Sequence, residues 1–234
     1  MSVSLNELSY RILLIVRPKI SDDESIDISE IRYDIETTRA LLTKRRYSNT
    51  FRHQLPESIV QSIKNIEIEY VNSSNSPITS RNIIMRSVNK VPKIMEYHSG
   101  MPMIKNISTA TILSNNFTMI TQQQASSCGN GKFNQHNIFC FYEDDYLYFI
   151  TRRMLFKGVK YINLDAVFER PTSVFEYLNT YNNENLDRNS PYPISLDMVD
   201  DIEQIIIKNK LRIEAAQPID DVNDSSDTKE IIQQ

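Results

Sequence analysis

The sequence predicts an α+β protein. In this fold class, a helical bundle formed by the N- and C-terminal helices carries a β-rich central insertion and ends in an extended C-terminal arm. Apolar residues recur at helical spacing near both ends and at period two in the middle, and acidic and polar residues dominate after Glu214. We therefore divide the chain into N-terminal helices (1–55), a β-rich central region (56–182), a C-terminal helix (183–213) and an acidic arm (214–234).

The first helix is expected over residues 4–17. Ser4 is a favourable N-cap, Glu7 follows three residues later as in a capping box, and Pro18 ends the helix. Apolar residues cover more than one stripe of this helix, so we expect it to be buried on more than one side. Its main apolar face carries Leu5, Leu8, Ile12 and Ile15.

Two further helices are predicted from their ends. The second begins at Ser29, or at Asp27 one turn earlier, and its last turn holds the basic residues Lys44, Arg45 and Arg46. The final helix opens after Ser195, with acidic residues in its first turns. Both charge placements suit the helix dipole. The apolar face of the final helix carries Val199, Ile202, Ile205 or Ile206, and Leu211.

The central region has the period of β-strands. Residues 66–71 alternate between apolar and polar side chains, as do residues 160–168. Residues 137–142 and 146–150 flank the acidic triplet at 143–145, which predicts a hairpin. Three further segments are expected, namely a weaker strand region at 83–95 that Pro92 interrupts, a strand at 117–121, and a short helical turn at 173–178.

The composition bounds the function. The chain has 234 residues, enough to bury a sizeable core, and a net charge of -4, which argues against a dedicated surface for duplex DNA. Only four glycines are present, so a nucleotide-binding glycine loop is not expected. The start lacks the features of a signal peptide, no apolar run could span a bilayer, and two cysteines do not form a disulfide framework. We therefore expect a protein of a reducing cytoplasm.

The sequence contains only weak candidates for catalytic, phosphate-binding or metal-binding motifs. Cys128 and His136 could be a nucleophile and its base, but no third residue that would orient them can be named, and a surface loop is the simpler interpretation. The segment Gly129–Lys132 lacks the spacing of a phosphate loop. The histidines and cysteines are too scattered for a zinc site. We expect no catalytic residue, no metal and no cofactor.

Two basic groups remain as candidate contacts. One is the cluster Lys44, Arg45 and Arg46, and the other comprises Arg152, Arg153 and Lys157. They could bind DNA phosphates or a partner's acidic arm, or they could simply be solvated, as short charge runs usually are. The acidic C-terminal segment favours an arm that docks on a neighbour's basic face. Its candidate contact residues are Ile219, Asp220, Asp221, Val222 and Asp224.

Four segments resemble the tail adaptor or ring proteins of crAss-like and related short-tailed bacteriophages. They are the opening Ser4-Leu5-Asn6-Glu7-Leu8 with Ile12-Leu13-Leu14-Ile15, the stretch from Glu30 through Leu42, the stretch Tyr192–Val199 and the ending Pro218–Asp224. The resemblance covers most of the chain, in pattern more than in identity.

This resemblance implies a structural virion protein rather than an enzyme. It implies a head-to-tail connector below the portal, assembled in the host cytoplasm as a ring of about twelve copies. The expected partners are further copies, the portal protein, neighbouring tail rings, and genomic DNA passing through the lumen without sequence specificity. The alternative is a phage-encoded nucleic-acid-binding accessory protein, and a cysteine hydrolase using Cys128 and His136 is least favoured. We expect subunit or portal contacts at Leu5, Leu8, Ile12, Ile15, Val199, Ile202 and Ile206, together with the arm.

Overall fold

A computed structural model of the chain describes residues 3–19, 26–50, 54–71, 82–109, 117–128, 137–152 and 154–216. The helices of this part are α1 (Leu5–Val16), α2 (Ile28–Tyr47), α3 (Gln122–Ala125), α4 (Pro171–Tyr181) and α5 (Leu196–Ala216). Its strands are β1 (Gln61–Tyr70), β2 (Ile83–Ser87), β3 (Ile104–Thr109), β4 (Phe117–Met119), β5 (Ile138–Glu143), β6 (Tyr146–Thr151) and β7 (Tyr161–Ala166).

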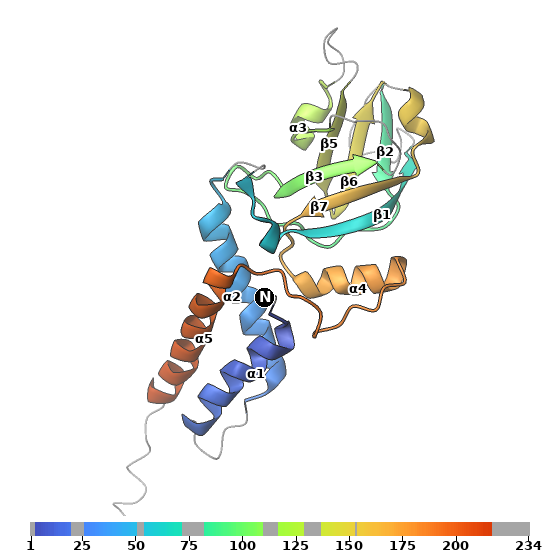
Figure 1. Cartoon of the computed structure of the whole chain (residues 1–234). Coiled ribbons are helices and arrows are strands. Elements are labelled where there is room, and N and C mark those ends of the chain that lie inside the picture. The colour runs from blue at the N-terminus through green and yellow to red at the C-terminus, as the bar shows by residue number, and fades with distance from the viewer. Residues whose placement is uncertain are drawn as a thin grey trace, which may run out of the picture.

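The strands form one seven-stranded mixed sheet in the order β3-β7-β1-β2-β6-β5-β4, which curls into a nearly closed barrel (Figure 1). The predicted fold class, a helical bundle with a β-rich insertion, is therefore wrong, because the protein is organised around the barrel. Its period-two segments pair across long sequence distances, β1 with both β2 and β7, and β7 also with β3. Periodicity identifies strands but does not say how they pair, and the pairing here builds one continuous structure.

The predicted hairpin is present as β5 and β6, which pair from Phe139 with Ile150 to Glu143 with Tyr146. Its turn residues Asp144 and Asp145 have φ angles of 50° and 67°, as a tight two-residue turn requires. The edge strand β4 adds to β5 in parallel, whereas the other strand pairs are antiparallel. The local turn chemistry therefore fixes the register of this part of the barrel.

The barrel has its own apolar core. Phe117, Phe149 and Phe156 meet there, with ring centroids 5.7–6.1 Å apart in edge-on or tilted arrangements that aromatic rings favour. Helix α4 covers one side of the barrel and contacts β1 (Figure 1). This helix is longer than the short helical turn predicted at 173–178. It begins at Pro171, since proline is tolerated in the first turn of a helix, and it continues to Tyr181.

Helices α1, α2 and α5 contact one another beside the barrel (Figure 1). Ser4 caps α1, its hydroxyl accepting from the Glu7 N–H at 3.1 Å, and Asp27 rather than Ser29 caps α2. Their shared core extends to the barrel through Met95, Met103 and Val167. The helices are therefore packed against the barrel as well as against each other.

Arg39 of α2 is fully buried where the helices meet the barrel. Its guanidinium donates to the backbone oxygens of Pro193 at 2.7 Å, Phe168 at 3.0 Å and Ile59 at 3.3 Å. Burial lowers the pKa of Arg39, because removing a cation from water disfavours the charged form. Ile59 lies between α2 and β1, Phe168 lies between β7 and α4, and Pro193 lies between α4 and α5, so one side chain joins the two regions.

Candidate assembly interface

Large apolar side chains are exposed mainly on the helices beside the barrel. Leu14 of α1 is 73% exposed and Leu41 of α2 is 47% exposed. Large apolar side chains that gather on exposed helical faces indicate a candidate surface for another protein. The exposed large apolar residues of α1, α2 and α5 are Tyr10, Leu14, Ile15, Tyr33, Leu41 and Leu196.

The residues predicted to contact other subunits fall into two groups. Ile15 is 39% exposed and is free to contact a neighbour. The other helical candidates lie in the apolar core of the chain itself, where they pack α1 and α5 against α2, and they present almost no area to a partner. These core residues are Leu5, Leu8, Ile12, Val199, Ile202 and Ile206. The arm candidates Ile219, Asp220, Asp221, Val222 and Asp224 lie outside the described residues.

A groove of about 650 Å³ runs between α2 and α5. Leu41, Ile205 and Ile206 contribute its apolar lining. At its rim, Lys210 of α5 forms ion pairs with Glu30 and with Asp34 of α2, the latter at 3.0 Å. Burial alone would lower the pKa of Lys210, but the hydrogen bonds to these carboxylates outweigh it and raise the pKa. The groove therefore combines an apolar floor with a charged rim.

A second hollow, of about 550 Å³, lies between the start of α1, α2 and α4 and is more polar. Arg32 donates to Asn6 Oδ1 at 2.8 Å there, and the guanidinium carbon of Arg170 lies 5.7 Å from the centre of the Tyr33 ring. Because Tyr33 already has a cationic neighbour within its own chain, it is a weaker candidate for an outside contact than Leu14.

The basic candidates are mostly engaged within the chain. Arg46 forms ion pairs with Asp197 and Asp201 of α5, which ties the end of α2 to the start of α5. Lys44 and Arg45 are exposed beside it. These contacts give the predicted basic cluster a structural role at Arg46 and leave its other two side chains facing solvent.

The second basic group also has intramolecular contacts. The Arg152 Nε donates to Asn82 Oδ1 at 3.0 Å, and the Lys157 ammonium lies 5.0 Å from the centre of the Tyr70 ring. Arg153 lies outside the described residues. Arg152 and Lys157 therefore both contact residues of their own chain on the barrel side.

The candidate nucleophile Cys128 is in an unfavourable environment for catalysis. Partial burial raises the pKa of its thiol, so less of the reactive thiolate is present at neutral pH. Its proposed partner His136 lies outside the described residues. Within the described ranges, no cluster of three or more His, Cys, Asp or Glu is placed to hold a metal ion, and no helix has the length and apolarity needed to cross a membrane.

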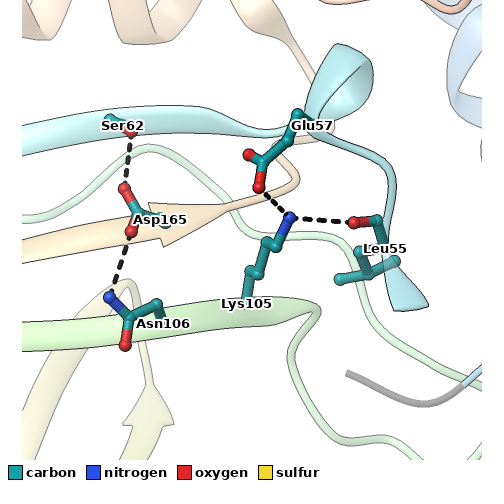
Figure 2. Close-up of polar contacts among 6 residues, drawn as sticks. All are labelled: Leu55, Glu57, Ser62, Lys105, Asn106 and Asp165. Carbon is teal, nitrogen blue, oxygen red and sulfur yellow. Dashed lines mark hydrogen bonds and ion pairs between the residues drawn. The ribbon is translucent and has the colours of Figure 1, made fainter. Parts of the chain in front are cut away.

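Part of the outer face of the barrel differs from the helices, because polar side chains there are paired across strands (Figure 2). Asp165 of β7 accepts from Ser62 of β1 at 2.5 Å and from Asn106 of β3 at 3.3 Å. One carboxylate therefore links three strands. The polar pairing is local, because β7 and β1 also expose the rings of Tyr161 and Tyr70.

A similar polar contact lies at the start of β3. Lys105 donates to the backbone oxygen of Leu55 at 3.0 Å and forms an ion pair with Glu57 (Figure 2). This contact attaches the edge strand to the segment that leads from α2 into β1. The candidate assembly interface is thus on the exposed apolar faces of the helices.

Comparison with known proteins agrees with a structural role. No curated protein matches the chain. The profile of the family described as phage tail ring protein 2 matches residues 7–229, which is nearly the whole chain and includes both the helices and the barrel. Proteins of a phage tail ring family are components of the virion. The chain therefore belongs to the phage tail ring protein 2 family and is a tail ring protein of crAss-like phages.

Proposed function

We propose that this tail ring protein is a subunit of the head-to-tail connector, assembling below the portal as a closed ring of copies, about twelve in number, through which genomic DNA passes. The family match carries the proposal. The exposed apolar side chains of α1 and α2 support it, because a stable ring subunit hides apolar area only in the assembly. The net charge of -4 suits a passage that does not hold the phosphate backbone of DNA.

The C-terminal arm after Ala216 is proposed to contact the portal or an adjacent ring. Its sequence combines carboxylates, which suit a basic surface, with the apolar anchors Ile219 and Val222. Burying one such anchor contributes about 1.5–3 kcal/mol, which corresponds to a tenfold or greater change in affinity.

Electron microscopy of purified virions tests the position of the ring. The expected result is a ring of this protein in direct contact with the portal, and its symmetry gives the number of copies. A ring located only at the far end of the tail would contradict the connector role. The assembly is expected to form in the host cytoplasm, so complexes of this protein with the portal should be recoverable from infected cells before lysis.

Binding to purified portal tests the arm separately. A chain ending at Ala216 should bind portal at least about tenfold more weakly than the full chain, because both apolar anchors are lost. A full-length Ile219→Ser, Val222→Ser variant should show the same loss, whereas Gln233→Ser at the end of the arm should not. Equal affinity of the full and shortened chains would show that the arm does not contact the portal.

A further inference from the structure

We infer that neighbouring copies in the ring join by seating the outer face of α1 from one copy in the groove between α2 and α5 of the next. This inference rests on the proposed assembly of the chain into a ring of its own copies. The outer face of α1 is defined by Tyr10, Leu14 and Ile15, and the groove is defined by the exposed Leu41 and the half-buried Ile205 with its charged rim.

The outer face of α1 has the spacing of a helix that binds in a groove. Tyr10 and Leu14 are four residues apart and therefore lie on the same side of the helix, where they are 55% and 73% exposed. Leu8 and Ile12, also four apart, are fully buried against the rest of the chain. Apolar anchors at such spacing are typical of a helix that a hydrophobic groove receives.

The groove and the outer face of α1 point in different directions within one copy. Helices α1, α2 and α5 contact one another pairwise, and every residue that lines the groove belongs to α2 or α5. Arg11 of α1 pairs with Glu203 of α5 at 3.1 Å, so α1 packs against α5 without contributing to the lining of the groove. In this structure a chain therefore does not fill its own groove with the outer face of its own α1.

Two different complementary faces are what a ring requires. In a closed ring larger than a dimer, each copy presents one face to the preceding copy and a different face to the following one. The α1 face and the α2–α5 groove supply one such pair. A symmetric dimer would instead need a single self-complementary face.

Charge agrees with this pairing. Arg17 is exposed at the end of α1, next to the outer face. The rim of the groove carries the carboxylates Glu30 and Asp34 against the single cation Lys210, and the Glu30 side chain is 56% exposed. A cation arriving beside the apolar anchors therefore meets a rim with an excess of negative charge, which favours this orientation.

Substitutions on the two faces test the pairing. Leu14→Asp and Leu41→Asp should each weaken association of the purified full-length chain by about 100-fold, because each replaces an apolar contact with a charge that must lose its water. Met154→Asp is the matched control, since Met154 is also 73% exposed but lies on the barrel side in the 3₁₀ segment Met154–Gly158. Native mass measurement gives the oligomer sizes, and far-UV circular dichroism checks that each variant is folded.

Disulfide trapping gives the decisive result. In a Cys128→Ser background, a Leu14→Cys chain mixed with a Leu41→Cys chain should form mixed disulfide dimers on oxidation, and each variant alone should not. This inference would be overturned if rings formed but the mixture gave no crosslink. It would also be overturned if the Leu14→Asp chain still formed rings. Either result would leave the ring assembly itself unchallenged. A wild-type chain that stays monomeric both alone and with the portal would overturn the ring assembly itself.

Discussion

The barrel and the three helices beside it differ in what they leave at their surfaces. The barrel packs Phe117, Phe149 and Phe156 inside and links β1, β7 and β3 outside through Asp165. The helices have a buried core of their own but expose side chains such as Leu14. The barrel thus has a closed core and locally paired polar groups, whereas the exposed apolar residues of the helices make them the candidate surface for another protein.

The largest expected effect tests whether the barrel is held by its own core. Phe149 is fully buried, so Phe149→Ala should lower the free energy of unfolding by about 3–5 kcal/mol through lost apolar contacts and a cavity. Urea unfolding of the dilute monomer, followed by circular dichroism, measures this change. Leu14→Ala is the counterpart on the helices and should change monomer stability by less than about 0.5 kcal/mol. A large loss from Leu14→Ala would remove the contrast between the regions.

The next effect concerns the junction of the two regions. Arg39→Ala leaves the buried carbonyls of Ile59, Phe168 and Pro193 without their donor, and unpaired buried polar groups cost about 1–3 kcal/mol each. We expect the free energy of unfolding, measured in urea, to fall by about 3 kcal/mol or more. Relative to the wild type, amide hydrogen exchange should accelerate more in α2 than in β6. Arg39→Lys should rescue only part of the loss, because one ammonium cannot reach all three carbonyls. If amide exchange in α2 of the Arg39→Ala variant were as slow as in the wild type, Arg39 would not join the two regions.

A pH-dependent effect tests the cover of the barrel by α4. Burial, and to a lesser extent the neighbouring Tyr181, raise the pKa of Tyr177 to about 12. The folded state therefore holds this proton more tightly than the unfolded chain, whose tyrosine pKa is about 10. The contribution of Tyr177 to stability should be constant below about pH 10 and fall by on the order of 2 kcal/mol as the pH rises to 12. In urea titrations at pH 8 and 11, Tyr177→Phe should show a smaller decrease than the wild type, and an equal decrease would contradict the assignment.

Local chemistry in the sequence predicted much of this arrangement. Ser4 as the cap of α1 and the acidic turn of the β5–β6 hairpin are confirmed, because caps and tight turns depend on a few adjacent residues. Strand β3 was not predicted. Its buried residues Ile104 and Ile107 are three apart, since the register with β7 shifts between Ile104 and Asn106 and breaks the period of two.

The interface is harder to predict than the elements for a physical reason. Leu8 and Leu14 look alike in the apolar pattern of α1, yet Leu8 is fully buried and Leu14 is 73% exposed. Only the positions of α2 and α5 distinguish the inner face of the helix from the outer one. The burial of Arg39 was not predicted, because arginine side chains are mostly exposed in folded proteins. Its partners are backbone oxygens, which no pattern of side chains in the sequence reveals.

The smallest expected effect separates charge from apolar contact in the helical region. Arg46 pairs with Asp197 and Asp201, but all three side chains are partly exposed, at 31%, 64% and 45%. Water and salt screen such pairs, so Arg46→Ala should lower monomer stability by only about 0.2–1 kcal/mol, and less in 1 M salt. Lys44→Ala is the matched control on the same exposed turn.

The same variant also tests which contacts dominate ring assembly. If Arg46→Ala weakened ring assembly more than Leu14→Asp, electrostatic contacts would dominate the interface. The opposite order is expected, because these ion pairs close within one chain, whereas the apolar face of α1 does not.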